Sequence, residues 1–388
     1  MSFTHILRPT YWFCNVISVS PFGVRLVPPN LATCYNIIAF FSIVYTLVVY
    51  ARYLIDTIVD KYMHVVLLCS YIVWYVFYRL IFLSILITAI FYHKEIENIR
   101  LKIIKVCHKL EEIGVNLNLK LIYSFQLGFI CFSLFISLPV SYYDVHVTMQ
   151  NILQGIVIFI SSFFSLTIPV LITAYSFIVN TQFKHVNSQL NNLLQHLDTT
   201  PTRDALNKLK QLISIHIDIR GIKHDISSAL HLPLFLYLAY SVISLSITIL
   251  ILIRSLSEYD FYFNTVSKFV AFKYVLLILF ITEICHRTAA EGNKTVLIVH
   301  RFFQSPLHHC FMDEIEMFSM GMIDNYCKFT AGGWFAIDRS LFMKIVIAVT
   351  TYVVICLQIN DGSNAETSSY PNATMFNFWN DTFNISFT

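Results

Sequence analysis

The chain has 388 residues, of which 56% are hydrophobic and only 13% are charged. Soluble domains carry about 25% charged residues, so a soluble fold of this size could not cover its surface with so few. The mean hydropathy of +0.65 and the long apolar runs indicate a membrane protein. This composition excludes a cytosolic enzyme, a secreted disulfide scaffold and a disordered chain. The formal net charge of +3 is small, and its distribution is more informative than its total.

No signal peptide is expected in segment 1–30, because Arg25 and two prolines follow its short apolar stretch without a small-residue cleavage site. Seven later stretches have about the length needed to cross a bilayer as helices. We therefore predict an all-α polytopic membrane protein with seven transmembrane helices. The predicted spans are 31–51, 64–92, 121–143, 151–179, 232–253, 266–285 and 341–359.

Lysine and arginine fall mainly on one side of these spans. Segments on the side of the N-terminus hold 19 of them, and the opposite segments hold 3. The positive-inside rule therefore places segment 1–30 in the cytoplasm, and an odd number of spans places the tail 360–388 outside. This orientation argues against a G-protein-coupled receptor. The tail lacks lysine and arginine but carries glycosylation sequons at Asn372, Asn380 and Asn384.

The central domain, 31–359, includes three long inner segments, at about 93–120, 180–231 and 286–340. One of them, 180–231, contains two apolar stripes at helical spacing, and an apolar stripe left in water is unfavourable. We expect these helices to pack together as a cytoplasmic anchor, with separate helices resting on lipid headgroups as the alternative. The stripes are Val186, Leu190, Leu193, Leu194 and Leu197, then Leu206, Leu209, Ile213 and Ile217.

Charged side chains also occur within the predicted spans, where they are costly and often functional. Arg79 lies near the middle of the second span and Glu283 near the inner end of the sixth, so an ion pair between them is one option. Lys273 and Lys344 lie near span ends, where long side chains can reach an interface. For each of these charged side chains, we favour either reach to the membrane interface or a structural ion pair over contact with a ligand.

The seventh span has one distinctive helical face. Lys344, Ala348, Thr351, Ile355 and Gln358 are spaced 4, 3, 4 and 3 residues apart, so they share one side of a helix. Thr351 and Gln358 either bond to a neighbouring helix or line a water-filled path in which apolar neighbours form a gate. The periodicity alone does not separate these two interpretations.

The end of the chain carries a recognisable pattern. Residues 329–341 read FTAGGWFAIDRSL, and residues 351–359 read TYVVICLQI. This stretch resembles the C-terminal signature of insect gustatory receptors, in which Thr-Tyr, five hydrophobic residues and Gln-Phe end the last span. Thr351, Tyr352 and Gln358 occupy the motif, and Ile359 replaces its phenylalanine. The rest of the chain is similar to the family in its topology.

The resemblance implies a tetrameric, ligand-gated, non-selective cation channel related to insect odorant receptors, in the cell membrane of a sensory neuron. Each subunit would supply its seventh span to a central pore, with Thr351, Ile355, Gln358 and Ile359 as pore-lining or gate residues. The assembly would be a homotetramer, or a heterotetramer with related receptors, surrounded by lipid. A small-molecule tastant would open it, and the divergent motif favours a bitter compound.

The resemblance also implies a ligand pocket that opens outward among the other spans. Outer halves of spans three to six offer aromatic and polar groups there. Aromatic residues near a membrane edge more often belong to packing or to an interfacial belt, and among the candidates we favour Tyr274 and Phe269. The candidates are Tyr142, Tyr143, Gln154, Tyr240, Phe269, Lys273 and Tyr274.

A secondary transporter is the alternative from another functional class, and it would use the intramembrane charges Arg79 and Glu283. Transporters usually show an internal repeat, and none is evident. No phosphate loop, nucleophile elbow or His-Glu-x-x-His motif occurs, so we expect no enzyme, catalytic residue, cofactor or nucleic-acid partner. No metal site is expected either, because adjacent His308, His309 and Cys310 cannot easily close around one ion.

Overall fold

The computed structural model describes residues 6–18, 41, 65–148, 165–196, 202–258, 261–302, 309–323 and 326–369. These residues form long helices and one short hairpin, which confirms the predicted all-α class. The helices are α1 (Arg8–Ser18), α3 (Val65–Phe91), α4 (His93–Glu112), α5 (Leu119–Thr148), α7 (Thr167–Gln195), α8 (Thr202–Ala229), α9 (His231–Glu258), α10 (Phe261–Phe302), α11 (His309–Ile323) and α12 (Arg339–Ser369).

Four stretches of the described residues are long and apolar enough to cross a membrane. They are Leu119–Pro139, His231–Ile253, Ser267–Phe302 and Arg339–Ile359. They correspond to the third, fifth, sixth and seventh predicted spans. The second predicted span is helical as α3 and contains the shorter apolar stretch Val76–Ile85. Most of the first predicted span and the start of the fourth lie outside the described residues, so the count of seven and the orientation stay predictions.

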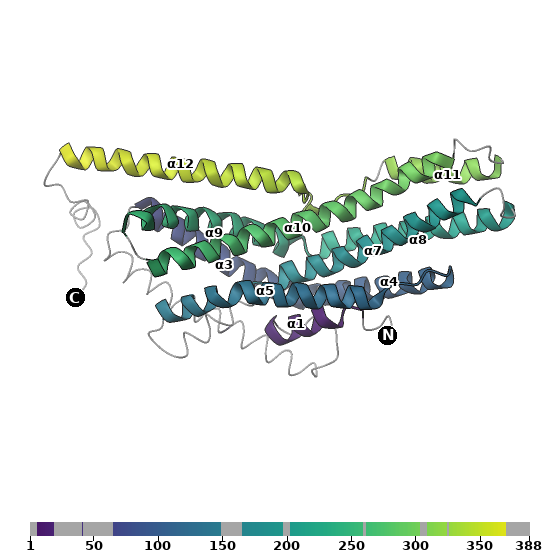
Figure 1. Cartoon of the computed structure of the whole chain (residues 1–388), viewed down its shortest axis with the longest axis horizontal. Helices are drawn as coiled ribbons and strands as arrows, with labels where there is room; N and C mark the ends of the chain where they lie inside the picture. The colour runs from purple at the N-terminus through teal and green to yellow at the C-terminus, as the bar shows by residue number, and fades with distance from the viewer. Residues whose placement is uncertain are drawn as a thin grey trace.

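The molecule is an elongated helical bundle (Figure 1). At one end lie α3, α9, α12 and the first half of α10; at the other lie α4, α8, α11 and the C-terminal halves of α7 and α10. We call this second group the distal bundle. The helix α10 joins the two ends without interruption, because it continues past the predicted span end at residue 285 as far as Phe302. Similarly, α12 continues beyond the predicted end at 359 to Ser369.

The predicted apolar stripes hold the distal bundle together. Val186, Leu190 and Leu193 on α7 and Leu209 on α8 are almost fully buried, and α8 packs against α4, α7 and α11. Packing of these helices is therefore confirmed, although Ile217 at the end of the second stripe is half exposed. Ion pairs join α8 to its neighbours, through Lys102 and Asp225 (2.7 Å), Lys109 and Asp218 (2.6 Å), and Lys210 and Glu314 (2.7 Å).

The short helix α1 packs on the bundle where α5 begins and α7 passes. The hydroxyl oxygens of Tyr11 and Tyr175 lie 2.7 Å apart, and the Thr10 hydroxyl donates to the Gln126 side-chain oxygen at 2.9 Å. Trp12 is exposed on the opposite side of α1. Thus one face of this helix belongs to the core and Trp12 on the other face is exposed.

Gly292 lets α10 approach its neighbours closely in the distal bundle. A Cβ atom at this position would lie 3.1 Å from the Cys327 Sγ and 3.1 Å from the Phe183 ring. Both of these side chains are almost fully buried, so neither can move aside easily. Residue 292 therefore has to be glycine for this packing to form.

The variant Gly292→Ala should lower the free energy of unfolding by about 1–2 kcal/mol, because overpacking outweighs the gain in helix propensity. Gly221→Ala on α8 is the matched control, since nothing lies within 4 Å of its added Cβ. That control should raise stability by about 0.5–1 kcal/mol. Thermal unfolding of both variants in detergent tests this, and equal stabilisation by both would contradict the close packing.

Candidate functional site

The helix α12 is attached to the rest of its chain along one narrow face. Ile345, Val349, Val353 and Cys356 are buried on it, against Leu245 and Leu250 of α9 and Ile278 of α10. In its apolar stretch only 22% of the residues are buried. This is the lowest share among the four stretches of the described residues that are long and apolar enough to cross a membrane. Most of this apolar helix therefore faces lipid or another molecule.

The five residues that the sequence places on one face all lie away from the bundle. Lys344, Ala348, Thr351, Ile355 and Gln358 are exposed, and we call them the α12 line. Tyr352 and Ile359, the other residues of the quoted motif, are exposed as well. The hydroxyl of Thr351 and the amide of Gln358 thus point away from the rest of the chain, which makes bonding to a helix of the same chain the weaker of the two interpretations.

The connector, residues 326–338, leads from α11 to α12 and is fastened to the distal bundle. The Asn293 side chain donates to the Cys327 carbonyl at 2.9 Å and accepts from its amide at 2.8 Å. The Lys223 ammonium donates to the Lys328 carbonyl at 2.9 Å, and burial lowers the pKa of Lys223. Phe329 is buried beside it. The start of α12 is therefore positioned by α8 and α10.

Within the connector, β1 (Thr330–Ala331) and β2 (Phe335–Ala336) pair antiparallel, with Thr330 opposite Ala336. Gly332, Gly333 and Trp334 form the turn, and the φ angles of 62° at Gly332 and 76° at Gly333 favour glycine at both positions. The sequence prediction missed this hairpin, although its Gly-Gly dipeptide was the available signal. The hairpin reverses the chain just before α12.

Asp338 begins α12 as its N-cap. Its carboxylate accepts hydrogen bonds from the Ser340 hydroxyl at 2.6 Å and the Leu341 amide at 3.0 Å. These bonds, that from Ser340 above all, hold the pKa of Asp338 below its usual value. The carboxylate is thus charged at neutral pH, and it fixes the residue at which the helix starts.

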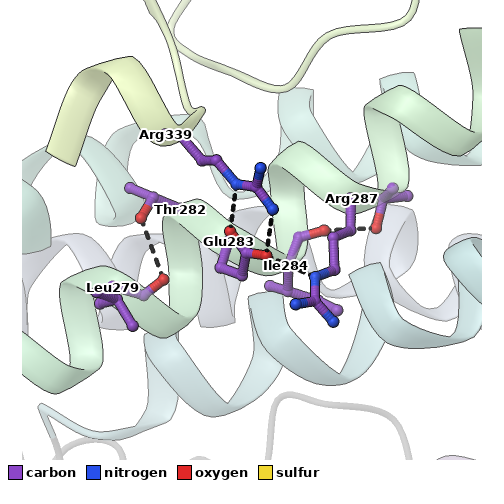
Figure 2. A network of polar contacts seen from close by, with 7 residues as sticks. Leu279, Thr282, Glu283, Ile284, Arg287 and Arg339 are labelled. Carbon is purple, nitrogen blue, oxygen red and sulfur yellow. Dashed lines mark hydrogen bonds and ion pairs between the residues drawn. The ribbon is translucent and has the colours of Figure 1, made fainter. Parts of the chain in front are cut away.

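The next residue, Arg339, ties α12 to α10. Its guanidinium donates two hydrogen bonds to the Glu283 carboxylate, from Nε at 2.7 Å and from Nη2 at 2.7 Å. Arg287, one turn further along α10, donates to the same carboxylate at 2.6 Å. Figure 2 shows Glu283 between the two arginines.

The option of an Arg79–Glu283 ion pair is therefore wrong. Glu283 pairs with Arg339 and Arg287, whereas the Arg79 guanidinium lies 5.6 Å from the centre of the Tyr78 ring. The sequence could not reveal this, because the partners come together only when α12 folds back along α10. The charge pair that a transporter would have used at this depth is not formed.

Two of the predicted ligand-contact residues lie together in a tyrosine cluster of α3, α9 and α10, made by Tyr78, Tyr240 and Tyr274. The Tyr274 hydroxyl donates to the Tyr240 hydroxyl at 2.9 Å, and the Tyr78 and Tyr240 ring centres lie 5.4 Å apart. Lys273 places its ammonium 5.4 Å from the centre of the Tyr274 ring. The sequence prediction missed Tyr78, whose polar aromatic character beside Arg79 was the available signal.

Other predicted contacts have different positions. Lys273 is only 3% exposed, so the expectation that it reaches an interface is wrong; the neighbouring helices cover it. Phe269 is 46% exposed. Other predicted residues lie outside what the structure describes. They are the side chains of Tyr142 and Tyr143, residue Gln154, and the sequons at Asn372, Asn380 and Asn384.

Comparison with known proteins identifies the family. A family model described as 7tm chemosensory receptor matches residues 7–361. The chain belongs to this chemosensory receptor family. It is a multi-pass membrane receptor family rather than an enzyme family, and the resemblance to insect gustatory receptors is thereby confirmed.

Curated relatives of this chemosensory receptor come from Drosophila melanogaster. It is 26% identical over 236 residues to gustatory receptor 28b, covering 53% of this chain and 50% of the relative. It is 25% identical over 234 residues to gustatory receptor 68a, covering 57% of this chain and 59% of the relative. The chain thus spans about half the length of the curated relatives it matches.

Solved structures of low sequence identity share the fold. The insect olfactory receptor OR5 from Machilis hrabei matches with a TM-score of 0.64 at 11% identity, covering 91% of this chain and 97% of that one. The same receptor in complex with eugenol matches with a TM-score of 0.56 at 11% identity, again covering 91% and 97%. The chemosensory receptor described here therefore has the fold of an insect olfactory receptor.

Proposed function

We propose that this chemosensory receptor is a gustatory receptor and a ligand-gated, non-selective cation channel, in which α12 lines the pore. The observation that supports this most directly is the exposure of the whole α12 line. Thr351 and Gln358 put hydrogen-bonding groups on a helix that is otherwise apolar, and hydrocarbon cannot satisfy them. Facing copies of α12 around a shared axis would place them against water.

Four copies around that axis, of this chain or of related receptors, would form the pore. Thr351 and Gln358 then supply oxygen atoms to a passing cation, while Ile355 and Ile359 supply an apolar constriction that can gate by dewetting. The tail and the last turns of α12 carry Asp361, Glu366 and Asp381. In four copies, these carboxylates concentrate cations at the pore mouth.

The ligand would be a small-molecule tastant, with a bitter compound as our choice. The complex of OR5 with eugenol supports small-molecule binding by this fold. The tyrosine cluster, together with Lys273, offers hydroxyl, ring and ammonium groups from three helices. These groups could orient a partly polar, partly apolar molecule. Phe269, Tyr142 and Gln154 stay predictions for the same pocket.

The proposed topology keeps seven spans, a cytoplasmic N-terminus and an extracellular tail with its three sequons. The lysine and arginine bias of the loops supports this orientation. The ion pairs that join α4, α8 and α11 support it as well, since a charged distal bundle belongs in water. In this arrangement the distal bundle is the cytoplasmic anchor.

Cysteine accessibility along α12 tests the proposal. Thr351→Cys, Ile355→Cys and Gln358→Cys should each give a cation current that a cationic thiol reagent, added outside, reduces by about tenfold through repulsion. Val349→Cys and Val353→Cys are matched controls on the buried face of the same helix. Their currents should be unchanged, as should that of the wild type. Equal sensitivity on both faces would contradict a pore lined by the α12 line.

A further inference from the structure

The carboxylate of Glu283 accepts hydrogen bonds from two arginines that belong to different helices. Arg339 belongs to α12 and donates two hydrogen bonds to it, at 2.7 Å each. Arg287 belongs to α10, as Glu283 does, and donates one at 2.6 Å (Figure 2). The Arg339 contact therefore depends on where α12 lies, whereas the Arg287 contact is local to one helical turn.

Along α10, Glu283 lies between the tyrosine cluster and the residues that hold the distal bundle and the connector. It is about two and a half helical turns along α10 from Tyr274, which belongs to the tyrosine cluster. In the other direction, α10 continues without a break to Gly292 and Asn293, which hold the distal bundle and the connector. A helix of this kind moves as a rigid element, so a shift near Tyr274 reaches Glu283 and then Arg339.

Apart from the connector and the Arg339 pair, α12 is attached to the chain along its buried face. Its buried face, around Ile345, Val349 and Val353, packs against Leu245 and Leu250 of α9 and Ile278 of α10. Apolar contacts of this type let a helix slide or rotate, because they are not directional. A bidentate Arg–carboxylate pair is directional and fixes both the height and the rotation of the helix that carries it.

We propose that Glu283 is a positioning residue for gating. Its pair with Arg339 holds α12 in a resting position, and opening releases Arg339 while Arg287 keeps the carboxylate paired. The resting assignment follows from Ile355, an apolar member of the α12 line, which favours a dewetted pore in this position. This inference rests on the proposed channel function.

Basal current, recorded without any ligand and normalised to surface expression, tests the proposal. Glu283→Gln and Arg339→Gln should each raise it at least about threefold, since an exposed pair adds a modest bias toward one state. The double variant should match the single ones, because either change removes the whole pair. Arg339→Lys should be intermediate, since an ammonium lacks the bidentate geometry.

Arg287→Gln is the matched control. It removes one positive charge from the same carboxylate but leaves the α10–α12 pair intact, so its basal current should not exceed that of the wild type. A rise equal to that of Arg339→Gln would show a general charge effect and overturn the proposal. Unchanged currents in Glu283→Gln and Arg339→Gln would overturn it too, provided that the thiol reagent blocks current through Gln358→Cys. If no variant, Gln358→Cys included, carries current above untransfected cells, the channel function itself is wrong.

Discussion

Replacing Gln358 by lysine is expected to reduce the cation current strongly, and replacing it by glutamate is expected to increase that current. Gln358 is exposed on the α12 line, far along the helix from the Glu283–Arg339 pair. In a tetramer the lysine variant would place four positive charges around the pore axis, in a region of low dielectric constant. Such a ring repels cations strongly, and we expect a reduction of at least about tenfold.

The sign of the effect makes this test decisive. A glutamate at the same position has a similar size but attracts cations, so relative permeability to divalent cations should rise. Gln358→Met is the neutral control, and its current should fall between those of the charged variants. The measurement is whole-cell current with surface labelling of each variant. If lysine and glutamate change the current in the same direction, Gln358 does not face the permeating ions.

The stability of the receptor is expected to fall by about 2 kcal/mol between pH 6.5 and pH 5 because of His216. His216 is fully buried in the distal bundle, with ring centres of Phe183 and Phe318 at 5.1 and 5.3 Å. Its Nε2 lies 3.2 Å from the Gly292 carbonyl oxygen, to which it can donate. Burial lowers the pKa of His216 to about 4.

Stability falls with falling pH because His216 binds its proton at different pH values in the unfolded and the folded chain. Below about pH 6.5 the unfolded chain binds a proton at this histidine, whereas the folded chain stays neutral down to about pH 4. The unfolded state is therefore favoured increasingly as pH falls through this window. Below about pH 4 the two states are both protonated, and the loss from this residue is complete.

Thermal unfolding in detergent at several pH values checks this expectation. His216→Gln should remove about 2 kcal/mol of the pH dependence, because glutamine can donate to the Gly292 carbonyl and does not titrate. His224→Gln is the control on the same helix, where the side chain is 78% exposed. That control should keep the wild-type slope. An unchanged slope in His216→Gln would mean that His216 has the same pKa in the folded and the unfolded receptor, which would contradict the prediction.

Local hydropathy and the spacing of apolar residues were enough to predict several elements of this receptor. The third, fifth, sixth and seventh predicted spans coincide with helices because a run of apolar residues in lipid must satisfy its backbone internally. Stripes at helical spacing predicted which sides of α7 and α8 are buried. The spacing of Thr351 and Gln358 predicted a shared face of α12, because helix geometry fixes it without reference to any neighbour.

Contacts between distant segments could not be predicted in the same way. The pairing of Glu283 with Arg339 depends on how the connector directs α12 along α10, and the burial of Lys273 depends on helices that pack over it. Whether the buried or the exposed face of α12 contains Gln358 is likewise a matter of packing. The sequence by itself determined the helical membrane class, the positions of several spans and the residues that share a face, since these follow from local hydropathy and helix period. Only the tertiary structure decided which charges pair and which face is left open, because those depend on side chains far apart in the chain meeting in space.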